Sequence, residues 1–586
     1  MPPTLPQTNV VQGSTRPARG SVVNTAVPYN ERPLRGATTR GLHPGRLDRA
    51  EPLAGPTRGT GGLRSARPLE EARMRSRLSI LATAGLLAMM VAPAAPAAVS
   101  AAGPMLVPLA IQAPESPGLP GDLTTPACTS PDPVHTYAWY HCYTPSDIVT
   151  AYDLAGVQTA ANYGAGQTIV LVDAYGSPTA AADLQFFHDT FYPKLADPSF
   201  EQVFPQGNPQ YMNTWHGNGL SGPNGAANWA GEATLDIEWA YAIAPLAHIV
   251  LLAVPPAETE GVQGFPNLFN AMQWAVDTYP AGTVFSQSFG VTEQTFGGAA
   301  AVQTAKFDAV YQAGNAKGDT FLASSGDNGT TGTAKQQKEG RVYSYPTTGW
   351  PASSPYVTAV GGTQLQYGWT WAPTSDTPVL ADGSLNPGYF AYTSSSSTTE
   401  VVWNESWLPS ATGGGPSAIY ARPSWQSGVA SVIGANARGV PDLSWNAAVN
   451  GGALVYSSFY PNVSRVGWHV YGGTSAASPQ IAGVIALTNA EQAAASEPPI
   501  GDVAPFLYSS HMSASDFTDI VPVTEGTALS GVLADNTLWQ YNADGSVSAG
   551  PVPGHPVQTG WDMATGFGSP IGAPFVADLR AARNAP

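Results

Sequence analysis

Buried strands and helices alternate along the middle of the chain without an intervening linker. This alternation constrains the fold most, because strands joined by helices form a parallel sheet whose functional site lies at the carboxyl ends of the strands. We therefore predict an α/β fold, with one large parallel sheet flanked by helices in a single large domain. The expected strands are 168–173, 247–254, 283–290 and 320–327, and the expected helices are 178–193, 229–243, 265–278 and 299–316.

Residues 363–420 depart from this pattern. They are rich in Ser, Thr, Gly, Trp and Pro, a composition that is typical of turns and irregular segments. We expect long surface loops here.

The N-terminal region has the organisation of an exported precursor. Met74-Arg75-Ser76-Arg77 precedes an apolar run, residues 78–91, and a zone rich in Ala and Pro comes after it. A basic start, a short apolar centre and small residues predict a signal peptide over 74–103, which is too short for a comfortable membrane span. We therefore expect a secreted, extracellular protein. Residues 1–73, rich in Pro, Arg and Gly, are interpreted as a disordered or mis-called extension, with Met74 as the true start.

A Pro-rich arm, residues 104–142, joins this region to the predicted domain, residues 143–586. The arm contains both cysteines of the chain, Cys128 and Cys142. In a secreted protein, two cysteines so close in sequence are expected to form a disulfide. Their spacing matches no metal-binding pattern.

The charge of the chain is divided unevenly. Residues 104–586 carry 11 basic and 36 acidic residues, a net charge of 11 − 36 = −25. Such a surface repels nucleic acid and anionic membranes, so we expect neither a nucleic-acid partner nor stable membrane association. It also suits an acidic environment, because a chain poor in Lys and Arg gains little positive charge when its carboxylates are protonated.

The strongest motif is Y-G-G-T-S-A-A-S-P-Q-I-A-G-V-I-A-L, residues 471–487. Two glycines precede Ser475, which falls in the first turn of an apolar helix. A Ser at this place often only caps the helix. The longer string G-T-S-A-A-S-P-x-x-A-G, however, resembles the nucleophile motif of the subtilisin-like superfamily. A nucleophilic Ser475 needs a base.

Two sets of residues could supply that base. The first is Asp173, which ends a predicted strand, together with His216 in the loop W-H-G-N-G-L-S-G. His216 lacks a second His and a following apolar helix, and a loop His of this kind is most often only polar surface. The second is the pair Glu232 and Asp236, which are four residues apart and share one face of a helix. Glu238 lies on another side of that helix and receives no role.

The chain resembles the sedolisin family of serine-carboxyl peptidases from about Tyr143 to its C-terminus. The resemblance implies a subtilisin-like fold, with Ser475 as the nucleophile, Glu232 as the general base, Asp236 orienting Glu232, and Asp327 lining the oxyanion hole. The motifs that carry it are A-N-W-A-G-E-A-T-L-D-I-E-W-A-Y-A-I-A-P-L-A-H-I around Glu232, A-S-S-G-D-N-G (323–329), T-G-G-G-P-S (412–417), R-P-S-W-Q (422–426), R-G-V-P-D (438–442), D-I (519–520) and G-W-D-M-A-T-G-F-G-S-P (560–570), besides the Ser475 string.

These roles agree with acid chemistry. A His with a pKa near 6.5 is protonated in acid and cannot act as a base, whereas a carboxylate with a pKa near 4 still can. Asp327 can stabilise an oxyanion only when it is protonated. The residues therefore predict an acidic optimum, roughly pH 3–5 from ordinary pKa values.

The resemblance also implies one structural Ca²⁺ ion near the C-terminus. Asp519 and Asp562 would provide side-chain oxygens, and Ile520 and Gly560 would provide carbonyl oxygens. Gln558 would provide a further carbonyl, although the family usually has Gly at this position. A second departure is the short Pro-rich arm, where family precursors commonly carry a large folded prosegment.

The sequence therefore predicts a secreted, acid-acting serine-carboxyl endopeptidase that acts as a monomer on protein or peptide substrates. Two alternatives stay open. One is a neutral subtilisin-type protease that uses Asp173, His216 and Ser475, and the other is a catalytically inactive secreted binding protein with the same fold.

Overall fold

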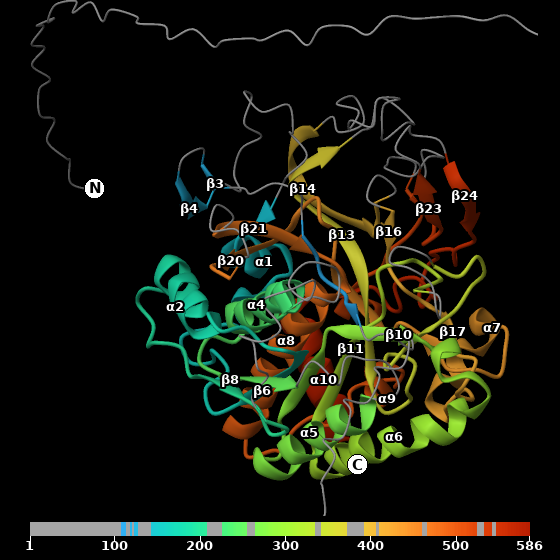
Figure 1. Cartoon of the computed structure of the whole chain (residues 1–586), viewed down its shortest axis with the longest axis horizontal. Helices are drawn as coiled ribbons and strands as arrows, with labels where there is room; N and C mark the ends of the chain where they lie inside the picture. The colour runs from blue at the N-terminus through green and yellow to red at the C-terminus, as the bar shows by residue number, and fades with distance from the viewer. Residues whose placement is uncertain are drawn as a thin grey trace, which may run out of the picture. The chain divides into compact units, whose positions relative to one another are not determined.

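A single large sheet organises the chain (Figure 1). The strand order is β14-β13-β11-β9-β6-β8-β7, and β19 pairs with β13 beside this path. All neighbouring pairs from β7 to β13 are parallel, and β14 joins the edge in antiparallel orientation. The predicted parallel α/β sheet is confirmed. Its strands are β6 (Thr168–Ala174), β7 (Phe200–Val203), β8 (His248–Val254), β9 (Val284–Gln287), β11 (Thr320–Ser324), β13 (Thr358–Trp371), β14 (Tyr392–Val402) and β19 (Leu443–Asn446).

This computed structural model describes part of the chain, and every described residue belongs to one compact unit, residues 94–586. The predicted extension and signal peptide, Cys128 and His216 lie outside the described residues. The predicted disulfide and export signal therefore stay predictions. The described residues are 107–112, 118–119, 122–126, 142–207, 226–254, 264–333, 342–371, 392–405, 409–459, 466–523, 533–541 and 547–585.

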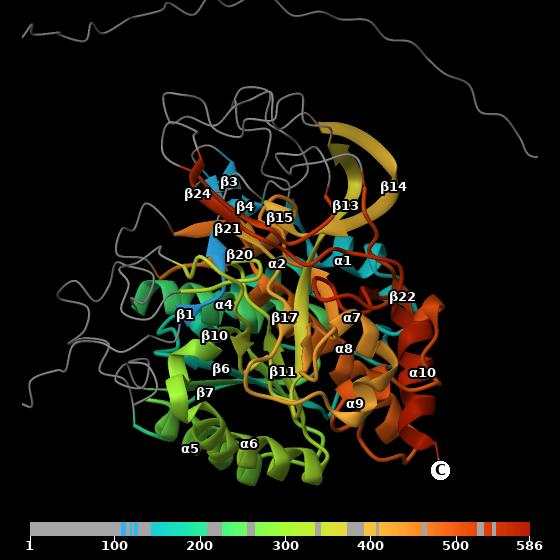
Figure 2. The same ribbon diagram turned by 90° about the vertical axis from the view of Figure 1, so that its right-hand side faces the viewer.

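Helices cover both faces of the sheet (Figure 2). Ile169 and Leu171 of β6 pack in a core with α4 and α8, whereas Val170 and Val172 point to the opposite face and pack with α5 and α6. This alternation is the period of two that every strand imposes on its side chains. The long helices are α2 (Ala180–Phe191), α4 (Ala226–Ile243), α5 (Phe265–Thr278), α6 (Ala300–Lys317), α8 (Thr474–Ala494) and α10 (Gly572–Asn584).

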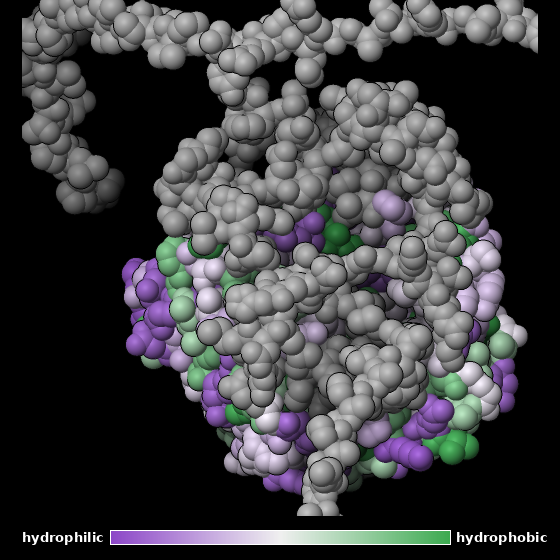
Figure 3. Space-filling view, in the orientation of Figure 1, coloured by the Kyte–Doolittle hydropathy of each residue, from purple (hydrophilic) through white to green (hydrophobic). Residues whose placement is uncertain are grey.

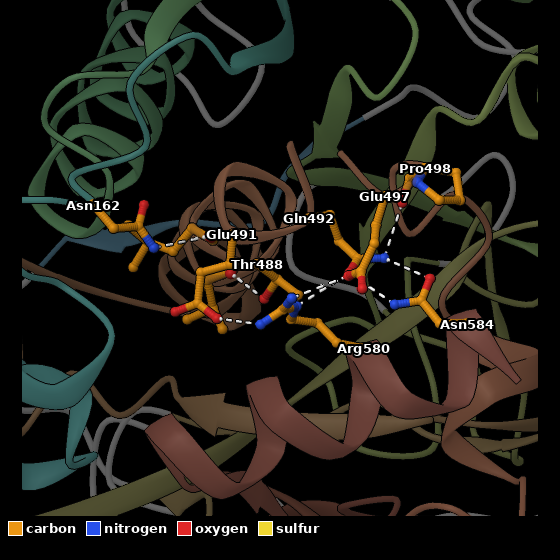
Figure 4. A network of polar contacts seen from close by, with 10 residues as sticks. Asn162, Thr488, Glu491, Gln492, Glu497, Pro498, Arg580 and Asn584 are labelled. Atoms are coloured by element: carbon orange, nitrogen blue, oxygen red, sulfur yellow. Dashed lines mark hydrogen bonds and ion pairs between the residues drawn. The ribbon is translucent and has the colours of Figure 1, made fainter. Parts of the chain in front are cut away.

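Helices α4 and α8 pack very closely. A Cβ atom at Gly483 would lie 2.5 Å from Cβ of Ile243, so only glycine fits at this crossing. At the far end of α8, helix α10 is fixed by Arg580, which binds Glu491 and Glu497 at 3.0 Å each (Figure 4). The position of α8 is therefore set from both sides.

The expectation of long surface loops over 363–420 is wrong for much of that segment. Strand β13 continues to Trp371 and pairs with β14 in antiparallel register from Thr363↔Val402 onward. Thr is a strand-forming residue, and Leu365 and Val401 are buried in the core. Among the described side chains of β14, Ser397, Thr398 and Thr399 are exposed, whereas Val401 and Val402 are buried. Composition alone does not separate such a strand from a loop.

The predicted strand 283–290 is interrupted. It forms β9 and then β10 (Phe289–Thr292), with Ser288 between them, and β10 belongs to a different sheet.

The smaller elements are α1 (Pro145–Ala151), α7 (Ala430–Ile433), α9 (Ala504–Leu507), β1 (Val107–Pro108), β2 (Ile111–Gln112), β3 (Gly118–Leu119), β4 (Asp122–Pro126), β5 (Cys142–Tyr143), β12 (Gly349–Trp350), β15 (Asn404–Glu405), β16 (Ser410–Ala411), β17 (Gly415–Pro416), β18 (Gly439–Val440), β20 (Gly452–Ser457), β21 (Gly467–Gly472), β22 (Phe517–Thr518), β23 (Leu538–Tyr541), β24 (Val547–Val552) and β25 (Ser569–Pro570).

The described surface mixes polar and apolar residues, and hydrophilic residues gather over α2 at one edge of the molecule (Figure 3). Among the described helices, none combines the length and the apolar character that crossing a bilayer requires.

The interior holds many carboxyl groups with raised pKa values. Burial is the main cause: it raises the pKa of Asp308 to about 6 and those of Glu405 and Asp502 to about 7. A carboxyl group whose pKa is raised by folding stabilises the folded state below its unfolded pKa, near 4. This contribution is lost as the pH rises through the folded pKa. The fold is therefore expected to be more stable in acid than at neutral pH.

Replacing Asp308 tests this pH dependence. Its carboxyl accepts hydrogen bonds from the Ser354 and Tyr420 hydroxyls at 2.8 and 3.0 Å, which Asn can retain without ionising. The experiment uses a Ser475→Ala background, which limits self-digestion. Between pH 4 and pH 7.5 the free energy of unfolding should decrease, and Asp308→Asn should make that decrease smaller by about 2 to 3 kcal/mol. Thermal and urea unfolding measure the free energy at each pH. The control is Asp277→Asn, an exposed acid on α5, and an equal effect of both variants would contradict the explanation.

Candidate active site

Helix α4 carries three acidic side chains into the interior, and two of them, Glu232 and Asp236, belong to the candidate site. Glu232 and Asp236 are one helical turn apart and have no solvent exposure. Oε2 of Glu232 accepts a hydrogen bond from the backbone N–H of Ala110 at 2.7 Å, and Oδ1 of Asp236 accepts one from the Ser288 hydroxyl at 2.9 Å. The other oxygen of each carboxyl has no hydrogen-bond partner among the described residues. Each carboxyl group of the pair is thus buried, with a hydrogen bond to only one of its two oxygens within the described part of the chain.

Ser475 lies at the N-terminal end of α8, next to this pair. The residue before the helix is Gly473, whose φ of 97° favours glycine, so Ser475 does not occupy the capping position. Its hydroxyl donates a hydrogen bond to the carbonyl oxygen of Ser288 at 3.3 Å. The Ser475 side chain is also close enough to Glu232 to lower the pKa of that carboxyl group. The predicted nucleophile and base are therefore neighbours.

Asp327 follows the carboxyl end of β11 and faces the same helix end. Its Oδ1 accepts hydrogen bonds from the backbone N–H and the hydroxyl of Thr474, both at 2.8 Å. Its Oδ2 is buried and accepts no bond from the described residues. A Cβ atom on Gly473 would lie 2.6 Å from Oδ2, so this free oxygen lies beside the residue that begins the helix. Burial raises the pKa of Asp327 to about 7 against the opposing effect of the Thr474 bonds.

Asp173 adds a third carboxyl group to the pair on α4. It ends β6, is fully buried, and neither of its oxygens has a hydrogen-bond partner in the described part of the chain. Burial raises its pKa to about 8. Burial raises the pKa of Glu232 and Asp236 as well, and the neighbouring Asp173 raises both further. Three buried carboxyl groups that raise one another's pKa do not all ionise readily, so they share protons.

The structure brings together the four residues that the sequence selected: Glu232, Asp236, Asp327 and Ser475. It places Asp173 beside Glu232 and Asp236. His216, the remaining member of the alternative neutral triad, is not among the described residues, so that set stays untested.

The sequence analysis missed Ser288, which contacts Ser475 through its carbonyl and Asp236 through its hydroxyl. It also missed Thr474, whose bonds hold Asp327. The available signal for Ser288 was its place at the carboxyl end of a predicted buried strand, where sites on parallel sheets form.

Residues 107–112 of the Pro-rich arm contact this site, where the N–H of Ala110 binds Glu232. Strand β1 pairs with β10 in antiparallel register, Val107↔Gly290 and Pro108↔Phe289, and β2 pairs with β21, Ile111↔Gly472 and Gln112↔Tyr471. The backbone N–H of Leu109 donates to the carbonyl of Ser288 at 3.2 Å. The arm thus adds strands to two small sheets beside the candidate catalytic residues.

Leu109 is buried and lines a pocket beside this site. The walls belong to β10 and to the segments that come after β11. Cδ1 of Leu109 would lie 3.5 Å from a Cβ atom added at Gly290, an ordinary van der Waals contact. The residues that line the pocket with Leu109 are Gly290, Val291, Thr292, Thr295, Ser324, Ser325, Gly326, Asp327, Asn328, Thr331, Gly332, Thr333 and Gly349.

The predicted Ca²⁺ ligands lie close together. The backbone N–H of Gly560 donates to both oxygens of Asp519 at 3.1 Å, and the N–H of Gln558 donates to Asp562 at 3.1 Å. Gln558 is not among the described residues with positive φ, so the change from Gly causes no backbone strain there. The carbonyl oxygens of Ile520, Gln558 and Gly560 accept no hydrogen bond from described residues.

This donor set fits a hard cation, which takes carboxylate and carbonyl oxygens. No group of three or more His, Cys, Asp and Glu residues in the described ranges could hold a metal. The predicted site has two carboxylates and three carbonyls, so it would not form such a group. It stays a prediction.

Comparison with known proteins gives consistent results. Residues 183–501 match the model of the Subtilase family. The chain is 30% identical to kumamolisin from Bacillus sp. (strain MN-32) over 443 residues, which are 73% of this chain and 62% of that protein. It is 29% identical to sedolisin from Pseudomonas sp. (strain 101), over 73% of this chain and 59% of that protein. It is 27% identical to human tripeptidyl-peptidase 1, over 62% and 55%.

A solved structure shows the same likeness. The structure of Pseudomonas sedolisin, a serine-carboxyl proteinase complexed with two molecules of pseudo-iodotyrostatin, superposes with a TM-score of 0.52 at 26% identity. The match covers 75% of this chain and 98% of that one. The chain spans about three-fifths of the length of the two bacterial relatives that it matches.

Proposed function

The chain belongs to the sedolisin family of the subtilisin-like superfamily, and on this premise we propose that it is a secreted serine-carboxyl endopeptidase that works in acid. The observation that carries the proposal is the position of Ser475, at the N-terminal end of α8, beside the buried carboxyl group of Glu232 on α4. The proposed substrates are proteins or peptides, and the proposed location, outside the cell, depends on the signal-peptide pattern alone.

The proposed reaction proceeds through an acyl-enzyme. As Oγ of Ser475 attacks the substrate carbonyl, Glu232 takes the hydroxyl proton and then donates it to the leaving amine. Protonated Asp327 donates from its free Oδ2 to the oxyanion. Water then hydrolyses the ester by the reverse sequence of proton transfers, and Ser475 is restored. Asp236 and Asp173 act by sharing protons with Glu232.

The raised pKa values suit acid rather than neutral pH. Asp327 can donate only below its pKa of about 7, so activity should fall as the pH rises through that value. On the acid side, one of the three coupled carboxyls must lose its proton. The hydrogen bonds from Ser475 and Ala110 favour the anion on Glu232. Because burial raises the pKa of Glu232, we expect the optimum to lie at or above the upper end of the pH 3–5 range that ordinary values predict.

The path of the arm supports an endopeptidase. Residue 107 lies two residues before Leu109 and is paired with β10, and the chain continues in sequence beyond it. A tripeptidyl-peptidase requires the N-terminus of its substrate three residues before the bond that it cuts. A substrate that lies as residues 107–109 do has no N-terminus at that place.

The predicted Ca²⁺ ion would be held by Asp519, Asp562 and the carbonyls of Ile520, Gln558 and Gly560. It would tie the loop after β22 to the loop before β25, and these two strands pair with each other. Its proposed contribution is to stability.

Single replacements separate the two possible bases. Glu232→Gln should reduce casein cleavage at pH 4 by about 10²- to 10⁴-fold, the range of general-base contributions. Ser475→Ala should abolish it, and His216→Ala should leave it within about twofold. Loss on His216→Ala alone, with activity at pH 8 and none at pH 4, would favour the neutral triad. No cleavage by the unchanged protein would favour the inactive binding protein.

Thr474 provides a test of Asp327. Its hydroxyl stabilises the Asp327 carboxylate, so Thr474→Val should raise the pKa of Asp327. The alkaline limb of kcat/KM should then move up by about one pH unit, the equivalent of one hydrogen bond to a charged group. Thr474→Ser retains the hydroxyl and should leave the limb in place. A limb that moves equally in both variants would show that Asp327 does not set it.

Removal of Ca²⁺ should destabilise the protein. Saturation at about 100 times the dissociation constant would add about 2.7 kcal/mol, so chelation should lower the melting temperature by several degrees. Asp519→Asn should weaken this response. Asp535→Asn is the matched control, because Asp535 also accepts a backbone N–H in a turn, from Thr537 at 2.9 Å, but is not a predicted ligand. An unchanged melting temperature after chelation of the unaltered protein would contradict the site.

A further inference from the structure

We propose that Glu405 is a positioning residue that sets the spacing between Asp327 and the first turn of α8. The proposal rests on the proposed peptidase function, in which Asp327 donates to the oxyanion. Glu405 acts through the segments that it holds and does not touch the substrate.

The carboxyl group of Glu405 is fully buried at the end of β15, and three N–H groups of the described chain donate to it. Nε1 of Trp403 and the backbone N–H of Val449 donate to Oε2 at 2.9 and 2.8 Å, and the N–H of Asn450 donates to Oε1 at 2.7 Å. A buried N–H group that loses its acceptor costs free energy. The carboxyl group therefore holds the turn 447–450, which joins β19 to β20, in one place.

This turn contacts the residues that begin α8. The carbonyl oxygen of Ala447 accepts the backbone N–H of Gly473 at 2.6 Å. The two segments are very close, because a Cβ atom on Gly472 would lie 2.6 Å from the nitrogen of Val449 and 2.7 Å from the carbonyl oxygen of Ala447. A displacement of the turn would therefore displace Gly473, and with it Thr474.

On its other side, Glu405 is linked to the segment that carries Asp327. Strand β15 pairs with β16 in antiparallel register, with Asn404 opposite Ala411. The backbone N–H of Ala411 donates to the carbonyl oxygen of Asp327 at 3.0 Å. The Asp327 segment and the start of α8 are therefore both connected to Glu405, each through its own hydrogen bonds.

The two connections meet where Asp327 binds Thr474. Oδ1 of Asp327 accepts the backbone N–H and the hydroxyl of Thr474 at 2.8 Å each, and these bonds leave Oδ2 for the oxyanion. A shift of either segment would lengthen these bonds and turn the carboxyl group, and a misplacement of about 1 Å can cost about 10²-fold in rate. Loss of Glu405 should therefore lower kcat more than it changes KM, because the oxyanion forms only in the reaction.

The variants are chosen to separate positioning from general stability. Glu405→Ala removes the acceptor, whereas Glu405→Gln retains one. Burial raises the pKa of Glu405 to about 7, so in acid the carboxyl group is neutral and has one carbonyl oxygen, as an amide has.

Asp319→Ala is the matched control. Asp319 is also fully buried, and its Oδ1 accepts the backbone N–H groups of two consecutive residues, Gly282 and Thr283, at 3.1 Å each. It precedes β11, at the strand end opposite to the one that Asp327 follows.

The experiment measures kcat and KM on fluorescein-labelled casein at pH 4. Glu405→Ala should lower kcat by about 10- to 100-fold and change KM by less than about threefold. Glu405→Gln and Asp319→Ala should both keep kcat within about threefold of the unaltered protein. Melting temperatures of all variants, taken in a Ser475→Ala background, show how much each replacement destabilises the fold.

The pH profile tests whether Glu405 acts through Thr474. The alkaline limb of kcat/KM should move up in Glu405→Ala by up to about one pH unit, because the Asp327 carboxylate loses hydrogen bonds. Glu405→Gln should leave the limb in place, which separates this effect from the titration of Glu405 itself. When Glu405→Ala is combined with Thr474→Val, the shift should be smaller than the sum of the two single shifts, since both changes weaken the same bonds.

Three results would overturn the positioning role and leave the peptidase standing: a kcat of Glu405→Ala equal to that of the unaltered protein, equal losses in Glu405→Ala and Asp319→Ala, or an alkaline limb that stays in place. If Glu405→Ala does not fold, Glu405→Asp replaces it, because its carboxyl group is one methylene further from the turn. A kcat of Glu405→Asp equal to that of Glu405→Gln would then contradict the role. No cleavage by the unaltered protein would overturn the proposed function, and this proposal with it.

Discussion

Carboxyl groups are buried beside the N-terminus of α8, and their burial determines how the stability and the proposed activity of the protein depend on pH. Glu232, Asp236 and Asp173 are fully buried and have few hydrogen-bond donors among the described residues, so both desolvation and mutual repulsion oppose their full ionisation. Protons must therefore remain in the cluster. An acidic medium provides them, and the same medium keeps Asp327 protonated for its proposed task at the oxyanion. Stability and catalysis thus favour the same range of pH.

The packing of α4 against α8 turns this electrostatic constraint into a defined geometry. Gly483 lets the two helices touch, and Gly231, directly before Glu232, lies where a Cβ atom would be 2.6 Å from the Tyr471 hydroxyl. Without side chains at these positions, the end of α4 that carries the carboxyl pair lies close to the first turn of α8. Because Glu232 and Asp236 are four residues apart, both carboxyl groups lie on the same face of α4. On that face Ser475 lies beside Glu232, and the Ser288 hydroxyl binds Asp236.

Local patterns in the sequence predicted the sheet, the carboxyl pair and the place of Ser475, because each depends on residues close together in the chain. The features that were missed depend on distant partners. Glu238 was assigned no role, yet it is fully buried and accepts the N–H of Tyr456 on β20 at 3.0 Å. The role of Ser288 depends on a break between β9 and β10. The segment 363–420 was misjudged because a strand rich in Thr and Ser is recognised by its partner strand, not by its composition.

The short arm answers a difficulty that the sequence raised, the absence of space for a large prosegment. The six residues 107–112 are part of the same chain as the site that they cover. This covalent link gives the segment a high effective concentration at the site, so that a short segment with few contacts can stay bound. The arm is held on both sides of the site, because β1 pairs with β10 and β2 pairs with β21. A peptide substrate that pairs with the same two strands would therefore have to displace the arm before its carbonyl group could reach Ser475.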